Sequence, residues 1–335
     1  MTRPLRFGLW YSLRNPAPWR RPDTEIYAGT LRQIAWAEQI GYDDVWLTEH
    51  HFCEDGHAPS ILPLASAVAV ATRRIRIGTS VLLLPLHHPV RVAEDAATID
   101  ILSNGRFDLG VGIGYRPQEF DGFGISVKTR GARVDEGLAI IRALWRGETV
   151  DFHGKYYQVK GATLAPRPVQ DPMPLWVGGF APASARRAAL LGDGYIGTGE
   201  MTELVRIYRE TLAEQGKPGP GRAAGGHFWL ITSKTPSRTF QQVAPHVLYQ
   251  IRMYNQWLGD AGQALFPEVT DPAQLAEMGI LSVVTPTEAT DMIGAYAEAT
   301  GIERYYTWTV PPGMQESAMD EYLQLFAEEV MPHFR

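Results

Sequence analysis

The chain lacks several features that mark particular classes of protein. Its 335 residues include one cysteine, Cys53, so no disulfide can form within the chain. A net charge of −6 offers no basic surface to nucleic acid or anionic lipid. The longest apolar stretch without charge, residues 58–72, is too short to cross a bilayer. Arginines within the first 14 residues interrupt any apolar signal segment. We therefore expect a cytoplasmic protein that binds neither nucleic acid nor membrane.

What the chain does contain is an alternation of two hydrophobic periods. Short runs rich in branched and aromatic residues are separated by longer segments with helical spacing, which favours a parallel sheet with helical crossovers. An open doubly wound sheet would favour a glycine-rich turn after the first strand, and "LWYSLRNPAPW" has none. We therefore predict an α/β fold, a single (β/α)8 TIM barrel over residues 1–335. The eight expected strands are 6–11, 43–48, 75–84, 106–114, 174–180, 194–199, 227–233 and 304–310.

Between and beyond these strands, two helices and three longer segments can be recognised. The capping box at 285–288 predicts a helix that ends at Gly301, and another helix is expected over 317–330. Residues 147–172 resemble a hairpin with a proline-rich connection, and 216–226 resemble a flexible connector. Residues 236–279 are too long for one crossover and carry four large aromatic residues. This insertion is expected either to cover the active mouth or to pack as extra helices on the side.

Polar residues follow the second expected strand in "VWLTEHHF" (45–52). In a barrel, the carboxyl ends of the strands line the site, so Glu49 and His50 would face it. Neighbouring residues on an extended strand point to opposite faces, so His50 and His51 could not readily share a metal ion, and the pair His87–His88 has the same defect. We expect no metal, and the absence of a Gly-x-Ser-x-Gly turn gives no support to a serine triad.

Two glycine patterns stand near the expected site, and each allows two interpretations. Gly178 and Gly179 lie between a strand and a helix that begins near Ser184, where backbone N–H groups could bind a phosphate. They could equally serve only a tight turn. The alternate glycines of "GVGIGYR" (110–116) could accommodate a flat ligand against bare backbone, or relieve crowding inside the barrel.

Five ordered motifs resemble the bacterial-luciferase-like, flavin-dependent monooxygenases. They are "GYDDVWLTEHHF", "IGTSVLLLPLHHPVR", "NGRFDLGVGIG", "LWVGGFAPAS" and "FAEEVMPHF". The similarity covers nearly the whole chain and is weakest from about 217 to 280. The resemblance implies a luciferase-like barrel that holds reduced FMN, or the deazaflavin F420, at the carboxyl ends of its strands.

The resemblance also implies roles for individual residues. Glu49 would lie near the flavin, and His50 would be the catalytic base or would stabilise the flavin after its reaction with oxygen, with His51 only orienting. Ser80 and Val81 would form a non-prolyl cis peptide behind the flavin ring. The remaining cofactor contacts would come from Gly112, Gly178, Gly179, Phe180 and Ser184, the last three holding the phosphate mostly through backbone.

The sequence departs from the luciferase pattern at two positions. Luciferase-type subunits carry a cysteine and an arginine where this chain has Gly112 and Ile113, so light emission is not expected and the phosphate needs another cation. Arg116 and Arg133 are the candidates by sequence.

We accordingly expect an oxidoreductase that uses reduced FMN and dioxygen to oxidise a small, apolar organic substrate. No Gly-x-Gly-x-x-Gly turn for a nicotinamide cofactor is present, so a separate flavin reductase would supply the reduced FMN. The alternatives are an F420-dependent oxidoreductase that transfers hydride and a flavin-binding protein of this fold without catalysis. Related proteins form dimers through the second and third helices, and the small-residue face at 64–71 permits such a homodimer.

Overall fold

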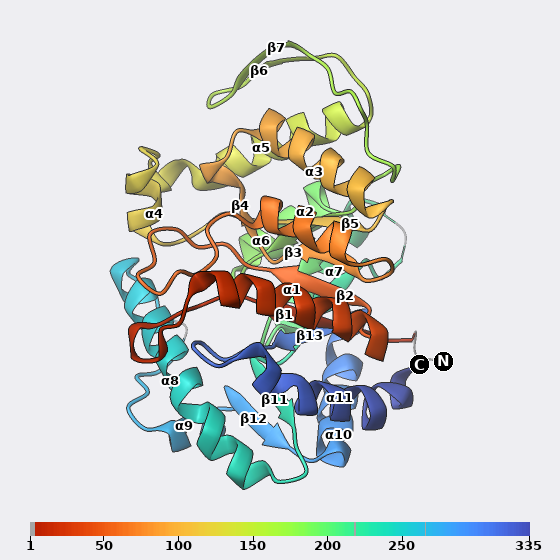
Figure 1. Cartoon of the computed structure of the whole chain (residues 1–335). Coiled ribbons are helices and arrows are strands. Elements are labelled where there is room, and N and C mark those ends of the chain that lie inside the picture. The colour runs from red at the N-terminus through yellow and green to blue at the C-terminus, as the bar shows by residue number, and fades with distance from the viewer. Residues whose placement is uncertain (1–3, 218, 265) are drawn as a thin grey trace.

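The computed structural model describes residues 4–217, 219–264 and 266–335, and it contains a closed parallel barrel. Eight strands follow one another around the barrel in parallel register, and the pairing of β3 with β5 completes the circle. The predicted (β/α)8 barrel is therefore confirmed (Figure 1). The barrel strands are β1 (Arg6–Tyr11), β2 (Asp44–Leu47), β3 (Arg76–Thr79), β5 (Phe107–Gly112), β8 (Leu175–Gly178), β9 (Gly194–Ile196), β10 (Ala223–Gly225) and β13 (Arg304–Trp308).

Helices surround this barrel because each crossover returns the chain to the same end of the sheet. The helices that cover the strands are α1 (Asp23–Ile40), α2 (Ile61–Ala71), α3 (Pro89–Ser103), α5 (Arg130–Trp145), α6 (Pro182–Leu191), α7 (Thr202–Glu214), α10 (Pro286–Thr300) and α11 (Asp320–Glu329). The short helix α4 (Pro117–Gly122) and the two-residue strand β4 (Leu82–Leu83) lie in loops at the carboxyl end. Among the described residues, no helix is long and apolar enough to cross a membrane.

Helix boundaries follow local signals. The capping box predicted at Thr285 is present, with the Thr285 hydroxyl accepting from the Glu288 N–H, and the helix ends at Gly301 in a left-handed conformation. The last helix differs from the prediction of 317–330, because Glu316–Met319 forms a 3₁₀ turn before α11 begins at Asp320.

The seventh barrel strand is not the predicted one. Residues 223–225 pair with β9 and β13, whereas the predicted run 227–233 leaves the barrel. There, β11 (Trp229–Thr232) pairs with β12 (Leu281–Val284) in a separate two-stranded sheet. The prediction was wrong because the barrel strand is only Ala-Ala-Gly, in a stretch that reads as a flexible connector. A Cβ at the following residue, Gly226, would lie 2.0 Å from the Tyr306 carbonyl oxygen, so this position requires glycine.

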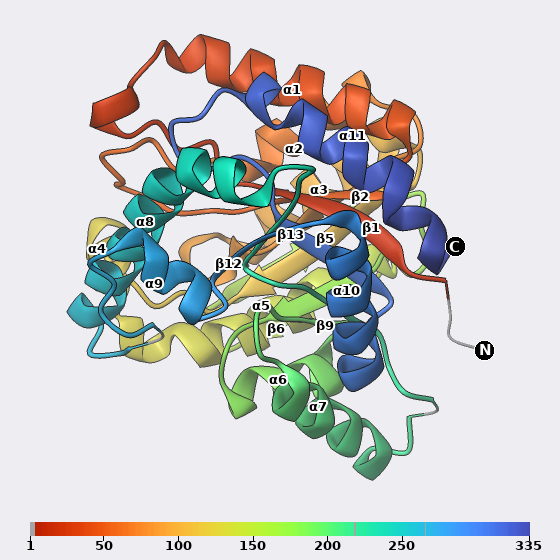
Figure 2. The same ribbon diagram turned by 90° about the horizontal axis from the view of Figure 1, so that it is seen from below.

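The two long segments outside the barrel occupy different places (Figures 1 and 2). A hairpin of β6 (Val150–His153) and β7 (Gln158–Ala162) follows α5 and lies beyond it in Figure 1. The segment between β11 and β12 contains the long helix α8 (Pro236–Asp260) and the short helix α9 (Pro272–Glu277). Helix α8 runs beside the carboxyl end of the barrel and places side chains in the cavity described below.

The amino end of the barrel is closed by charges that are buried and paired. Arg304 is 1% exposed and lies 2.8 Å from Asp108 and 4.0 Å from Asp44. Its guanidinium also lies over the rings of Trp46 and Trp176. Burial lowers the pKa of Arg304, but both carboxylates raise it, so the side chain stays charged.

Candidate active site

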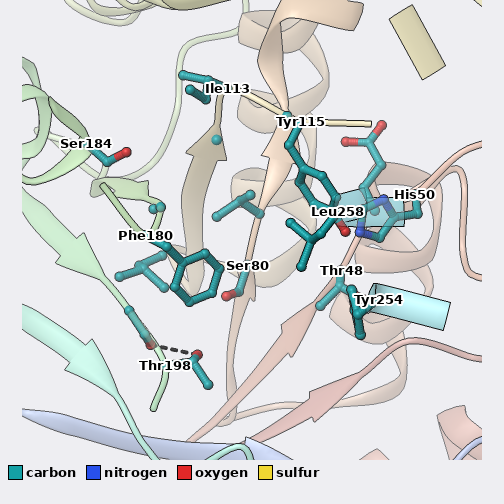
Figure 3. Close-up of a pocket in the computed structure, with 18 of the residues that line it drawn as sticks. Thr48, His50, Ser80, Ile113, Tyr115, Phe180, Ser184, Thr198, Tyr254 and Leu258 are labelled. Carbon is teal, nitrogen blue, oxygen red and sulfur yellow. Dashed lines mark hydrogen bonds between the residues drawn. The ribbon is translucent and has the colours of Figure 1, made fainter. Parts of the chain in front are cut away.

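A cavity of about 520 Å³ opens at the carboxyl ends of the barrel strands (Figure 3). This is a usual size for a site that binds a cofactor or small molecule. The residues predicted for catalysis and cofactor contact all line it, namely Glu49, His50, Ser80, Val81, Gly112, Gly178, Gly179, Phe180 and Ser184. They come from the ends of β2, β3, β5 and β8, which the barrel places side by side. The structure therefore brings the predicted residues together; their individual roles stay predictions.

His50 is held by a buried carboxylate. Its Nδ1 lies 2.8 Å from Glu119 Oε1, and that same oxygen accepts the backbone N–H of His51 at 2.8 Å. Glu119 is fully buried in α4. With Nδ1 engaged on the loop side, the imidazole is fixed in one orientation and Nε2 is the nitrogen left for another partner. Glu119 could not be recognised from the sequence, because it lies 69 residues from His50 on a helix of six residues.

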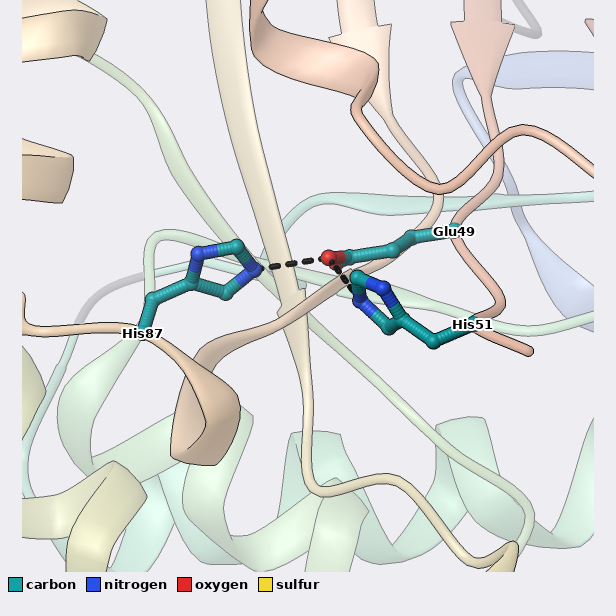
Figure 4. Close-up of side chains that lie close together, drawn as sticks. All are labelled: Glu49, His51 and His87. Atoms are coloured by element: carbon teal, nitrogen blue, oxygen red, sulfur yellow. Dashed lines mark hydrogen bonds and ion pairs between the residues drawn. The ribbon is translucent and has the colours of Figure 1, made fainter. Parts of the chain in front are cut away.

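Glu49 accepts hydrogen bonds from two other histidines, His51 and His87, rather than from His50 (Figure 4). Its Oε1 accepts hydrogen bonds from Nε2 of His51 at 2.8 Å and of His87 at 2.7 Å, and its Oε2 accepts the Leu83 N–H at 2.5 Å. Burial alone would raise the pKa of Glu49, but the two histidines lower it to about 2. Although burial opposes it, Glu49 raises the pKa of His87.

The same three side chains could also ligate a metal. One ligand atom from each of Glu49, His51 and His87 lies within 4.8 Å of the others. The two histidine pairs considered above consist of neighbouring residues, whereas this group takes one histidine from each pair. The spacing of its members along the chain therefore did not indicate a shared site. The hydrogen bonds account for the grouping without an ion, since both oxygens of Glu49 are already engaged.

The strand-3 end carries the expected backbone feature. The Ser80–Val81 peptide is cis, and Val81 lines the cavity. The glycines around it explain the alternating pattern in β5: a Cβ at Gly112 would lie 2.4 Å from Val81, and one at Gly110 would lie 2.0 Å from the Thr79 carbonyl. Crowding inside the barrel, the second of the two interpretations, accounts for these glycines.

At the opposite end of the cavity, β8 leads through Gly178–Gly179 into α6. Gly179 has φ +150°, and a Cβ there would lie 2.3 Å from the Ser184 hydroxyl, so the turn requires glycine. Helix α6 begins without a side-chain cap. Pro182 has no N–H and the Ser184 N–H is bonded to the Ala181 carbonyl, so the Ala183 N–H is the one in the first turn that is left for an anion. Arg130 lines the cavity too, and its buried Nε has no partner among the described residues.

The two arginines suggested by the sequence are engaged elsewhere. Arg116 donates to the carbonyl of His51 at 2.5 Å and lies over Trp257. Arg133 lies over the rings of Tyr156 and Tyr157. Neither lines the cavity, so Arg130, at the start of α5, replaces them as the candidate cation.

Aromatic side chains cover the His50 end. Tyr254 and Phe266 line the cavity together with Phe228, Trp229 and Trp308. The Trp257 ring lies 5.0 Å from the His50 ring. Because α8 supplies Tyr254 and Trp257, part of the insertion at 236–279 forms a wall of the site.

Comparison with known proteins places the chain in a family. The sequence model of the luciferase-like monooxygenases matches residues 5–303. An F420-dependent glucose-6-phosphate dehydrogenase of Nakamurella multipartita is 30% identical over 99% of this chain and 97% of its own. Among solved structures, the monooxygenase RslO1 of Streptomyces bottropensis has a TM-score of 0.87 at 24% identity, covering 99% of this chain and all of its own.

A second solved structure carries a bound flavin. The oxygenating constituent of 3,6-diketocamphane monooxygenase of Pseudomonas putida, in complex with FMN, has a TM-score of 0.81 at 22% identity, covering 99% of both chains. At these identities the two structures establish the fold alone, whereas the family match spans most of the chain. The chain is an oxidoreductase and belongs to the luciferase-like monooxygenase family.

Proposed function

We propose that the chain is a monooxygenase that binds reduced FMN in the carboxyl-end cavity and uses dioxygen to oxidise a small organic substrate. One observation carries this proposal. The cavity has the uncapped start of helix α6 and Arg130 at one end, and it has His50, held by Glu119 and covered by aromatic side chains, at the other. The first end suits a phosphate and the second suits a redox-active ring. The whole chain would form one domain around this site.

The phosphate would be held at the start of α6. Backbone N–H groups from Gly179 onward and the Ser184 hydroxyl supply donors, and Arg130 supplies the positive charge. Val81, beside the cis peptide, lines the stretch of cavity between this end and His50 and would support the ring. Bound FMN in its reduced form would supply the electrons that activate dioxygen.

The protein's own contribution is a dry site with one placed proton carrier. His50 would hold or move a proton at Nε2, because Glu119 engages Nδ1. The rings of Trp257, Tyr254 and Phe266 exclude water from it, which prevents loss of the activated oxygen to solvent. Since no nicotinamide site is evident in the sequence, a separate reductase would deliver the reduced FMN, and a homodimer through α2 and α3 is part of the same proposal.

An F420-dependent oxidoreductase is the second candidate. It is favoured by the curated relatives that match over the full length, which act with F420. A cavity with a phosphate end and a fixed histidine would serve this cofactor also. The third alternative, flavin binding without catalysis, is disfavoured by the pairing of His50 with Glu119, which orients a titratable group toward the cavity.

A two-step experiment separates the three candidates. Anaerobic titration with reduced FMN and with reduced F420 gives the affinity for each cofactor, and oxygen uptake is then followed with the reduced FMN complex. We expect FMN binding and oxygen uptake. Binding of F420 without any binding of reduced FMN would establish the second candidate, and binding without turnover of any substrate tested would favour the third.

A further inference from the structure

The His50 end of the cavity contains three polar atoms that the described residues leave without a partner. They are the Tyr115 hydroxyl, the Trp229 indole N–H and the Gln250 amide oxygen, all on side chains that line the cavity. Buried polar groups in native proteins are nearly always hydrogen-bonded, so three at one end of a cavity indicate groups that a ligand meets. All three are neutral, and two of them can donate to an oxygen atom.

No cation is free at this end among the described lining residues. Arg14 does not line the cavity; it binds Asp55 at 2.5 Å, and its guanidinium lies over Tyr254 and Trp257. Arg116 is held by the His51 carbonyl, and Arg130 stands at the phosphate end. Because no arginine or lysine lines this end among the described residues, an anionic ligand here would lack a direct ion pair with the cavity wall, which is unfavourable.

The walls at this end are flat and apolar. Tyr254, Leu258 and Trp308 line it, and Phe228, beside Gly199, and Phe266 continue the apolar lining of the cavity. The Phe228 and Phe266 rings are 4.9 Å apart, edge to face, and Trp308 stacks on Trp10 at 3.9 Å. Ring faces and edges of this kind favour another flat ring system over a flexible polar molecule.

Tyr115 is the polar group best placed for the reacting part of a substrate. Its ring lies 5.6 Å from the His50 ring, and Figure 3 shows its hydroxyl directed toward His50 and Leu258. Burial raises the pKa of Tyr115 well above its usual value, so the hydroxyl keeps its proton and remains a donor at neutral pH.

Building on the proposed function, we propose that the substrate is a neutral aromatic or fused-ring carbonyl compound whose carbonyl oxygen accepts a hydrogen bond from the Tyr115 hydroxyl beside His50. The Trp229 N–H and the Gln250 oxygen serve further oxygen substituents on the same ring system. Sugar phosphates, the substrates named for the F420-dependent relatives, are disfavoured at this end because no lysine or arginine lines it among the described residues. Tyr115 is thus a specificity-determining residue.

The test uses three probes of matched or contrasting chemistry. 1-Tetralone is a neutral fused-ring ketone, tetralin is the same skeleton without oxygen, and glucose 6-phosphate is the charged alternative. Binding is read from the fluorescence of the tryptophans that line the cavity, with and without FMN, so that failure of FMN to bind leaves the result for the ketone intact. The proteins compared are the wild type, Tyr115→Phe, Trp229→Phe and, as a control on the outer face of α1, Tyr27→Phe.

We expect the wild type to bind 1-tetralone about 10- to 100-fold more tightly than tetralin, because one buried hydrogen bond would otherwise stay unmade. This ratio should fall to within a few-fold in Tyr115→Phe, should fall less in Trp229→Phe, and should be unchanged in Tyr27→Phe. Equal affinity for ketone and hydrocarbon, or a ratio insensitive to Tyr115, would overturn the inference. So would tighter binding of glucose 6-phosphate than of 1-tetralone. If FMN does not bind but 1-tetralone binds as expected, only the proposed cofactor is overturned.

Discussion

The two ends of the barrel both bury charged side chains, but they use them differently. At the amino end, Arg304 is enclosed by Asp108 and Asp44 and stacked on tryptophan rings. At the carboxyl end, Glu119 engages His50, which lines the cavity, and Glu49, which lines the cavity itself, engages His51 and His87. The first arrangement pairs its charges with one another inside the core, where no ligand meets them. The second fixes the orientation of groups that remain available to a ligand.

Removal of His50 should produce the largest effect and should affect turnover alone. For His50→Ala we expect turnover to fall about 10²- to 10⁴-fold, because a placed proton carrier is lost. Affinity for the cofactor should change little, because the phosphate end is untouched. Oxygen uptake and a flavin titration measure the two quantities, with His153→Ala on the exposed hairpin as control. Wild-type turnover in His50→Ala would reduce this histidine to a structural role.

Removal of Arg304 should affect stability alone. Arg304→Met leaves Asp108 bound to Arg76 but removes the cation beside Asp44, which keeps only the Trp46 N–H, so we expect the free energy of unfolding in urea to fall by about 3–5 kcal/mol. The protein that remains folded should bind the cofactor normally. Arg206→Met is the matched control, because the ion pairs of Arg206 lie on the surface of α7 and should contribute little. A large loss of cofactor affinity with unchanged stability would reverse the assignment of the two ends.

The smallest of these effects concerns His87 and depends on pH. The raised pKa of His87 stabilises the fold below pH 6.5 and ceases to do so as the pH rises through the folded-state pKa. The pKa of Glu49, lowered from 4.5 to about 2, stabilises the fold above pH 4.5 and ceases to do so as the pH falls toward 2. The Glu49–His87 contact is therefore strongest between these limits.

For His87→Gln we expect a loss of about 1.5–3 kcal/mol near pH 5.5, the contribution of a hydrogen bond to a charged group. The loss should be smaller at pH 9, because His87 gives up its charge as the pH rises through its folded-state pKa. Urea unfolding of both proteins at the two pH values measures it. A difference in stability that grows with pH would contradict the charge assigned to His87.

Much of the fold could be predicted from the sequence, because its strands are apolar enough to stand out. Seven of the eight barrel strands were recognised by such runs. The exception, Ala223–Gly225, has side chains too small to form a recognisable apolar run. The apolar run that follows it belongs to a separate sheet. Packing around Gly226 decides which segment joins the barrel there, and the local pattern of hydrophobic residues contains no information about that packing.

The site could be predicted only where its residues adjoin a strand end or match a family motif. His50, Gly179 and Ser184 satisfy that condition and line the cavity. Glu119 does not, because its contact with His50 joins segments 69 residues apart. His87 lies in a family motif, but its contact with Glu49 spans 38 residues and is not visible in the local pattern. Arg130 was missed for a similar reason: only the fold decides which of several nearby arginines turns toward the helix start.

The central claim is that one cavity holds the flavin between the start of α6 and His50. A crystal structure of the protein soaked with FMN tests it most directly. We expect density for the phosphate beside Gly179, Ser184 and Arg130, and density for the ring system between Val81 and His50. FMN bound elsewhere on the protein, or a cavity that stays filled only with solvent at saturating FMN, would contradict the claim.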